Sequence, residues 1–200
     1  MIIGKSKKEI EKMRASGRLA GQVLSHLRNL AEPGVSTIEI DRVAEKMIRD
    51  AGALPTFKGY NGFPYSICAS VNEQVVHGFP SGYKLKEGDI FSIDCGVTLE
   101  GFVGDTAITV PIGKVDSERL RLIRITEECL ELAINECRAG NHLGDIGWAV
   151  QQHAEGNGYS VVRDYVGHGI GRRMHEDPQI PNYGKPGLGP KIKAGYVFAV

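Results

Sequence analysis

Residues 92–108, SIDCGVTLEGFVGDTAI, carry the pattern of a β-hairpin, with two apolar, β-branched runs around a turn signal that contains glycine. A two-residue loop at Leu99–Glu100 would place Asp94 directly opposite Asp105. A two-residue loop at Glu100–Gly101 would place the two residues diagonally on the same face. A three-residue loop would put them on opposite faces. The turn therefore decides whether this hairpin pairs two carboxylates or separates them.

Two Asp residues in a hairpin are open to two interpretations. One is an exposed hairpin with scattered acidic residues. The other is a carboxylate site for a divalent metal, because like charges on one face need a proton or a cation between them. The neighbouring residues favour the metal site, since they indicate buried strands, where an unpaired carboxylate is costly. These neighbours are Ile93, Cys95, Val103, Ala107 and Ile108.

Histidines elsewhere in the chain could supply further ligands. His168 and His175 lie in the glycine-rich segment GHGIGRRMHE, and His77 lies in NEQVVHGFP. A histidine among glycines is also compatible with a loop residue whose hydrogen bonds are satisfied. The flanking glycines, however, free the backbone of His168 for close approach to a ligand. The H-E-x-x-H pattern is absent, which excludes a zincin helix.

The rest of the chain predicts the order helix, helix, strands, twice over. Capping boxes at Ser6–Glu9 and Ser36–Glu39 open the first two helices. The other predicted elements are strands over 65–71 and 89–97, a long helix over 117–139, a shorter helix around 145–155, and a strand over 159–165.

The repeated order is also visible at the level of residues. KLKEGDIFSI, 84–93, aligns with KIKAGYVFAV, 191–200, and both lysines, the glycine and the phenylalanine are identical. Near the same offset, Gly34 falls close to Gly140. Asp94 directly follows the first copy, and the sequence ends where the second copy would have its counterpart.

Composition limits the classes of protein that the chain can represent. Hydrophobic residues make up 42% and charged residues 24%, as in ordinary globular proteins. The formal net charge of zero gives no electrostatic argument for nucleic acid or a membrane surface. Four cysteines without C-x-x-C spacing predict buried thiols in a reducing cytoplasm. The lysine-rich start, Lys5–Lys12, predicts a solvated helix face.

Three segments together, NEQVVHGFP, IDCGVTLEGFVGDTA and YVGHGIGRRMHEDP, resemble the type I methionine aminopeptidases, metalloproteases of the pita-bread fold. The resemblance covers essentially the whole chain. It implies an α+β pita-bread (creatinase/aminopeptidase) fold, a pseudo-two-fold repeat of helix, helix and strands. We expect one catalytic domain over 1–200, with halves of about 1–110 and 111–200 and the second half incomplete, lacking its final strands.

The same resemblance implies the metal ligands and the catalytic residues. Asp94 and Asp105 resemble the carboxylates that bridge two divalent metal ions, and His168 resembles the histidine ligand. His77 resembles the residue that contacts the substrate amide, and His175 the one that polarises the scissile carbonyl. The sequence does not choose among Co, Mn, Fe, Zn and Ni.

The family also implies a pocket for the methionine side chain. Its wall would consist of Phe57, Tyr60, Phe63 and Cys68, with Met174 opposite. The expected function is removal of the N-terminal methionine from nascent proteins and peptides. The expected partners are a peptide or nascent-chain N-terminus and the ribosome, with no direct contact to nucleic acid or membrane, for a cytoplasmic monomer.

The sequence departs from the family at its end. The family has two further glutamate ligands after the last strand, so we expect this truncated 200-residue chain to keep three of five ligands and to have impaired activity. An alternative is a catalytically silent pita-bread module that binds peptides or ribosomes. A third alternative is a proline-directed aminopeptidase or creatinase-like hydrolase, although those usually carry an extra N-terminal domain.

Overall fold

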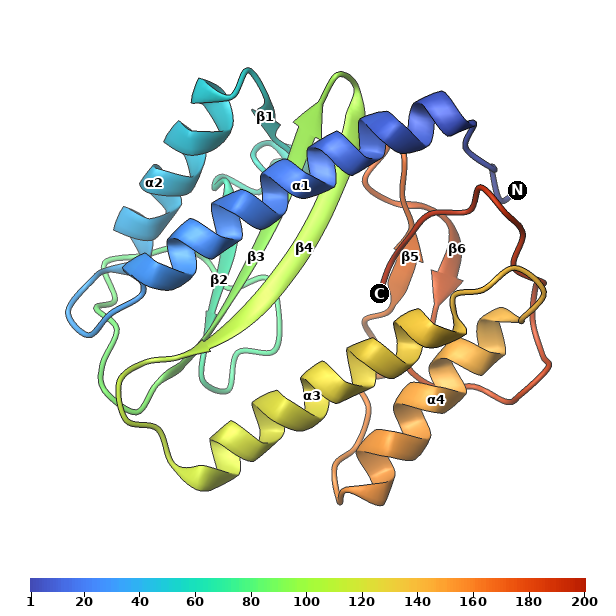
Figure 1. Cartoon of the computed structure of the whole chain (residues 1–200). Coiled ribbons are helices and arrows are strands. Elements are labelled where there is room, and N and C mark those ends of the chain that lie inside the picture. The colour runs from blue at the N-terminus through green and yellow to red at the C-terminus, as the bar shows by residue number, and fades with distance from the viewer. The chain divides into compact units, whose positions relative to one another are not determined.

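The computed structural model describes all 200 residues and divides the chain into two compact units. Glu11–Leu120 form one, here called the hairpin unit, and Met1–Ile10 with Arg121–Val200 form the other, here called the histidine unit. Figure 1 shows the elements along the chain.

The chain contains four α-helices, one 3-10 helix and seven strands. The helices are α1 (Lys7–Leu30), α2 (Thr37–Asp50), α3 (Ser117–Glu136), α4 (Leu143–Gly156) and the 3-10 helix η1 (Tyr60–Gly62). The strands are β1 (Leu54–Pro55), β2 (Ile67–Val71), β3 (Ile90–Leu99), β4 (Phe102–Pro111), β5 (Gly167–Gly169), β6 (Glu176–Ile180) and β7 (Phe198–Ala199). None of the helices combines the length and the hydropathy that a bilayer span requires.

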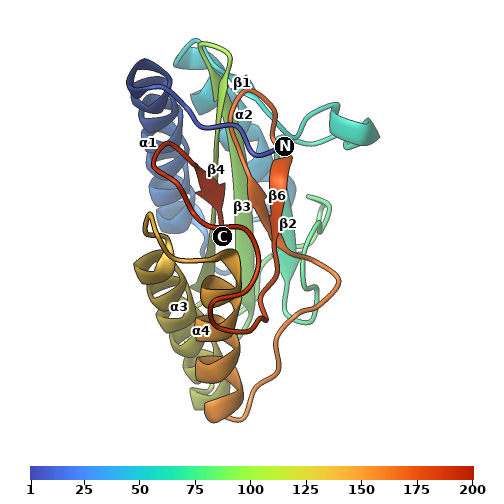
Figure 2. The same cartoon turned by 90° about the vertical axis from the view of Figure 1, so that its right-hand side faces the viewer.

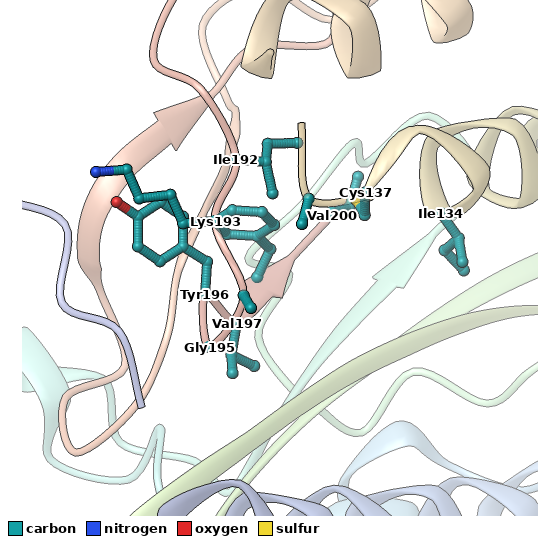
Figure 3. Close-up of a pocket in the computed structure, with 11 residues that line it drawn as sticks. Ile134, Cys137, Ile192, Lys193, Gly195, Tyr196, Val197 and Val200 are labelled. Carbon is teal, nitrogen blue, oxygen red and sulfur yellow. The ribbon is translucent and has the colours of Figure 1, made fainter. Parts of the chain in front are cut away.

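The sheet of the hairpin unit is built around β3. This strand pairs antiparallel with β1, β2 and β4, so it lies inside the sheet. Side chains alternate between the two faces of a strand, and those of Phe91, Ile93, Cys95 and Val97 are fully buried. They form one core with apolar residues of α1 and α2. Figures 1 and 2 show both helices on the same side of this sheet. The residues between them in sequence, including Asp94, therefore lie on the other face.

The histidine unit combines two helices with a second antiparallel sheet. Strand β5 pairs with β6 on one side and with β7 on the other. Helices α3 and α4 lie side by side in both views (Figures 1 and 2). The core of this unit brings together residues of α3, α4, β6 and the segment before β7: Ala133, Leu143, Ile146, Ile180 and Ile192.

The two units repeat the same hydrogen bonds where their sequences align. The amide of Gly34 donates to the carbonyl of Leu85 at 2.7 Å, and the amide of Gly140 donates to the carbonyl of Ile192 at 3.0 Å. In return, the Leu85 amide donates to the carbonyl of Val35, the residue after Gly34, at 2.9 Å. The Ile192 amide donates to the carbonyl of Asn141, the residue after Gly140, at 2.7 Å. The internal similarity in sequence thus corresponds to a repeated local structure.

The predicted strand over 159–165 is wrong, because this segment has no strand partner. The side-chain amide of Asn182 donates to the carbonyls of Val162 and Tyr165, at 2.9 and 3.0 Å, in place of a neighbouring strand. The guanidinium of Arg163 also stacks 4.6 Å from the ring centre of Tyr183. The Asn182 side chain therefore satisfies backbone carbonyls that would otherwise accept hydrogen bonds from a neighbouring strand.

Candidate metal centre

The hairpin turn adopts the second of the three expected geometries. Leu99 pairs with Phe102, which leaves Glu100 and Gly101 as a two-residue loop. Both loop residues have positive φ, 50° and 76°. Two positive φ values define a type I′ turn, the form whose twist matches antiparallel strands. The register of the whole hairpin follows from this turn.

That register places Asp94 and Asp105 on the same face. Asp94 lies opposite Ala107, and Asp105 lies opposite Gly96, so the two aspartates are diagonal neighbours. Both are half-buried. Among the flanking residues expected to be buried, Ile93, Cys95 and Val103 are buried, whereas Ala107 is exposed and Ile108 is half-buried. The hairpin therefore brings together the two carboxylates that the sequence singled out.

Cys68 on the adjacent strand lies within the electrostatic reach of both carboxylates. It pairs directly with Asp94 across β2 and β3. Burial, followed by the charges of Asp94 and Asp105, raises the pKa of the Cys68 thiol to about 12. The thiol is consequently neutral at physiological pH and behaves as a small apolar group.

This arrangement fits a divalent cation. Two carboxylates on one face repel each other unless a cation or a proton lies between them, and their charges already act together on Cys68. Carboxylate oxygens suit divalent ions from Mn to Zn, especially when an imidazole completes the donor set. The chemistry of the donors thus agrees with a metal held at Asp94 and Asp105.

The residues expected around the methionine side chain fall into two groups. Phe57 is buried, and its ring lies against Gly96, where an added Cβ would come within 2.5 Å of it. Because Gly96 is opposite Asp105, Phe57 and Cys68 both flank the carboxylates. Tyr60 begins η1 and is 39% exposed. Phe63 packs edge-on against two other aromatic rings, those of Tyr65 and Phe79.

His77 follows β2 in the hairpin unit. It is exposed and has a positive φ of 59°. The next residue, Gly78, accepts a hydrogen bond from the amide of Ala69 in β2 at 2.8 Å. The backbone beside His77 therefore runs along β2, the neighbour of the strand that carries Asp94.

The histidine unit brings His168 and His175 together. His168 lies in β5, and His175 directly precedes β6. Their ring centres are 4.4 Å apart, with the planes at 62°. The Nδ1 atom of His168 is 3.0 Å from the carbonyl oxygen of Gly169, next to an irregularity in the pairing of β5 with β6. Met174 is half-buried beside His175.

A buried ion pair next to His175 was missed by the sequence analysis. Lys5 Nζ is 2.7 Å from Glu176 Oε2, and the side chains are only 7% and 8% exposed. The other oxygen of Glu176 accepts a hydrogen bond from the Arg173 amide at 3.1 Å. Burial raises the pKa of Glu176, but the bonds from Lys5 and Arg173 outweigh it and leave the pKa below the usual range.

The prediction of a solvated helix face over Lys5–Lys12 is therefore wrong for Lys5. Lys5 precedes α1, and its amide donates to Gly195 at 2.7 Å. Its charge is neutralised by Glu176, a residue far away in sequence. Nothing in the lysine-rich segment itself distinguishes this lysine from its exposed neighbours, because only the tertiary partner makes its burial favourable.

The candidate residues thus form two pairs, each within its own unit. Asp94 and Asp105 share a face in the hairpin unit, and His168 and His175 are neighbours in the histidine unit. The structure contains no group of three or more His, Cys, Asp or Glu side chains arranged so that they could hold a metal ion. The assignment of His168 to the same metal site as the carboxylates stays a prediction.

The fold agrees with comparisons to known proteins. The model of metallopeptidase family M24 matches residues 11–200, and the chain belongs to this family. Two of its similar relatives are methionine aminopeptidases. A methionine aminopeptidase of Clostridium perfringens is 53% identical over 200 residues, covering 100% of this chain and 80% of that protein. Methionine aminopeptidase 1 of Bacillus subtilis is 48% identical, with 100% and 81% covered.

A solved structure supports the same conclusion. The methionine aminopeptidase of Thermotoga maritima superposes with a TM-score of 0.97 at 43% identity, over 99% of this chain and 80% of that one. The expected α+β pita-bread fold is thereby confirmed. The similarity to the methionine aminopeptidases, stated above as a resemblance of motifs, is also confirmed.

Proposed function

We propose that this chain is a metal-dependent aminopeptidase that removes the N-terminal methionine from peptides and nascent proteins. The observation that carries the proposal is the shared face of Asp94 and Asp105, set by the two-residue turn of the hairpin. The similarity to methionine aminopeptidases, at up to 53% identity in the comparisons above, supports the same substrate.

We assign the metal to Asp94 and Asp105, with His168 as the nitrogen ligand. Two ions are expected, drawn from Co, Mn, Fe, Zn and Ni. Bound divalent ions would supply Lewis-acid activation of water and of the scissile carbonyl. The fit of the Asp94–Asp105 face to a divalent cation supports this assignment. That His168 binds the same metal is part of the proposal.

The chain's own groups would recognise the peptide and its first residue. His77 would contact the substrate amide, and His175 would donate a hydrogen bond to the scissile carbonyl oxygen as negative charge develops there. Phe57 and Cys68 would line the pocket for the methionine side chain, together with Tyr60, Phe63 and Met174. The neutral Cys68 thiol, with its pKa raised to about 12, suits contact with a thioether.

A peptide assay with defined metals tests this proposal. The purified chain is stripped with a chelator and incubated with Met-Ala-Ser and each of the five metals in turn, and released methionine is measured. We expect release with at least one metal and none with the chelator present. A matched Leu-Ala-Ser peptide should be cleaved far more slowly. Tight peptide binding without release under any metal would contradict the enzyme and favour a silent binding module.

The expected cytoplasmic location, the monomeric state and contact with the ribosome remain predictions. Co-sedimentation with purified ribosomes and light scattering on the isolated chain address the last two. A monomer that co-sediments is the expected result.

A further inference from the structure

The loop that carries His77 is held at both of its ends by buried polar groups. Residues 73–77 are exposed, whereas the positions on either side are tied to the sheet of the hairpin unit. We propose that Asn72, Asp89 and Ser70 are positioning residues that fix the backbone of His77. The catalytic role of His77 in this inference rests on the proposed function, whereas the geometry of the loop does not depend on it.

The first attachment is Asn72, directly after β2. Its backbone amide donates to the carbonyl of Ile90 at 2.9 Å. Its side-chain oxygen accepts from the Ile90 amide at 3.1 Å, and its side-chain nitrogen donates to Asp89 Oδ1 at 2.9 Å. Asn72 has a positive φ of 55°, a conformation that Asn tolerates better than most residues. The amide side chain thus uses both of its ends to hold the start of the loop.

Asp89 holds the side chain of Asn72 in place at the start of the loop. Asp89 is 6% exposed, and its Oδ2 atom accepts from the Tyr83 hydroxyl at 2.8 Å and from the Lys86 amide at 2.9 Å. Its Oδ1 atom faces Asn72. The hydrogen bonds from Tyr83 and Lys86 fix the orientation of the Asp89 carboxylate, and the carboxylate in turn fixes the orientation of the Asn72 side chain.

The second attachment is Gly78, directly after His77. The Gly78 amide donates to the Ser70 hydroxyl at 3.1 Å, and its carbonyl accepts from the Ala69 amide at 2.8 Å. A Cβ on Gly78 would lie 2.3 Å from the Ala69 carbonyl oxygen, so only glycine permits this approach. His77 is thus adjacent to a backbone segment with little freedom.

His77 itself has a backbone conformation that needs such support. A positive φ is disfavoured for a residue with a side chain and persists where the surroundings hold it in place. The ladder of β2 with β3 ends at Val71 opposite Phe91. The Asn72–Asp89 bond continues the attachment beyond the ladder, so it acts on the loop and not on strands that are already paired.

Reversing the amide and the carboxylate provides a sharp test. In Asp89→Asn alone, the new amide nitrogen would face a donor in either orientation, the amide nitrogen of Asn72 or the backbone amide of Lys86. In Asn72→Asp alone, two carboxylates would face each other. In the double variant Asn72→Asp/Asp89→Asn, the new amide donates to the new carboxylate, while the remaining oxygens still accept from Ile90, Tyr83 and Lys86. The double variant should therefore restore the geometry that each single variant disrupts.

The readouts separate positioning from general stability. We measure the hydrogen-exchange rate of the Gly78 amide, the NMR signals of the His77 ring, and kcat and KM for Met-Ala-Ser, all well below the melting temperature. Asp145→Asn is the control. Like Asp89, Asp145 accepts hydrogen bonds from backbone N–H groups, those of Gly187 and His142, but it lies in the histidine unit. Ser70→Ala tests the second attachment separately.

Each single variant at position 72 or 89 should shift the NMR signals of His77 and speed hydrogen exchange of the Gly78 amide. It should also lower kcat about 10- to 100-fold with little change in KM, because a small displacement of a catalytic group has effects of this size. The double variant should recover most of the loss, and Asp145→Asn should change none of the three readouts. Unchanged His77 signals in Asn72→Asp and Asp89→Asn would overturn the inference. If the parent chain releases no methionine, the proposed function fails, while the NMR and exchange readouts still decide the positioning.

Discussion

The aspartates at positions 94 and 105 illustrate how a single turn residue controls a site. A one-residue change in loop length would move Asp105 to the face that packs against α1 and α2. There, its carboxylate would replace an apolar side chain in the core, at a large cost. The positive φ values of Glu100 and Gly101 are therefore a condition for the proposed metal centre as well as for the turn.

Asp105→Asn should have opposite effects on metal affinity and on metal-free stability. Removing one of two like charges on a face relieves their repulsion, so the free energy of unfolding in chelator should rise by about 0.5 kcal/mol. Affinity for Mn²⁺ should fall at least about tenfold, because one ligand is lost. Chemical denaturation and titration calorimetry measure the two quantities.

Glu100→Gln is the control for this experiment. It removes a negative charge from the same hairpin, at the exposed turn, where Glu100 contacts Lys12 at 3.1 Å. It should change neither quantity measurably, because exposed ion pairs contribute little. A fall in metal-free stability for Asp105→Asn would show that the two carboxylates do not repel each other.

At the scale of elements, local sequence signals predicted much of the fold. The capping boxes Ser6–Glu9 and Ser36–Glu39 are present, and the hairpin has one of the three expected registers. Helix α4 begins two residues earlier than predicted, at Leu143, because its N-cap is His142, a residue outside the usual capping set.

Features that depend on distant partners were not predictable in this way. The bonds from Asn182 that replace a strand partner over 159–165, and the burial of Lys5 by Glu176, leave no periodic pattern in the sequence. The aspartate pair could be foreseen because its geometry is local to one hairpin. The attachment of the His77 loop combines Asn72 and Asp89, 17 residues apart, and no motif connects them.

The cap of α4 should make stability depend on pH. Bonds from the Gly187 and His142 amides hold the pKa of Asp145 below its usual value of 3.8. A carboxyl whose folded pKa is depressed contributes stability above the unfolded pKa, and this contribution is lost as the pH falls through the folded pKa. Asp145→Asn should cost about 1 kcal/mol at pH 7.

The cost of Asp145→Asn should shrink as the pH falls below 3.8, because Asp145 of the unfolded chain then takes up a proton while Asp145 of the folded chain, with its lower pKa, is still charged. Urea denaturation at pH 7 and at pH 3 compares the two conditions. An equal cost at both pH values would indicate that the carboxylate charge does not contribute to the cap.

At the scale of the whole molecule, residues 1–10 belong with residues 121–200 through the Lys5–Glu176 pair. Lys5→Met leaves the Glu176 carboxylate buried without its partner, which typically costs about 3–5 kcal/mol. The loss should be confined to the histidine unit, so that amide exchange accelerates in β5 and β6 and not in β3 and β4.

Lys8→Met is the matched control, because Lys8 is an exposed residue of α1. It should change the free energy of unfolding by less than about 0.5 kcal/mol. If Lys5→Met had an equally small effect, or if it accelerated exchange in both units alike, the ion pair would not be what ties residues 1–10 to the histidine unit.

The Lys5–Glu176 pair also bears on the order in which the chain folds during synthesis. The hairpin unit ends at Leu120, so all its contacts are available while the second unit is still being made. Lys5 is translated well before its partner Glu176, which lies 171 positions later in the chain. The Lys5 side chain therefore stays solvated, without this carboxylate partner, until Glu176 has emerged from the ribosome.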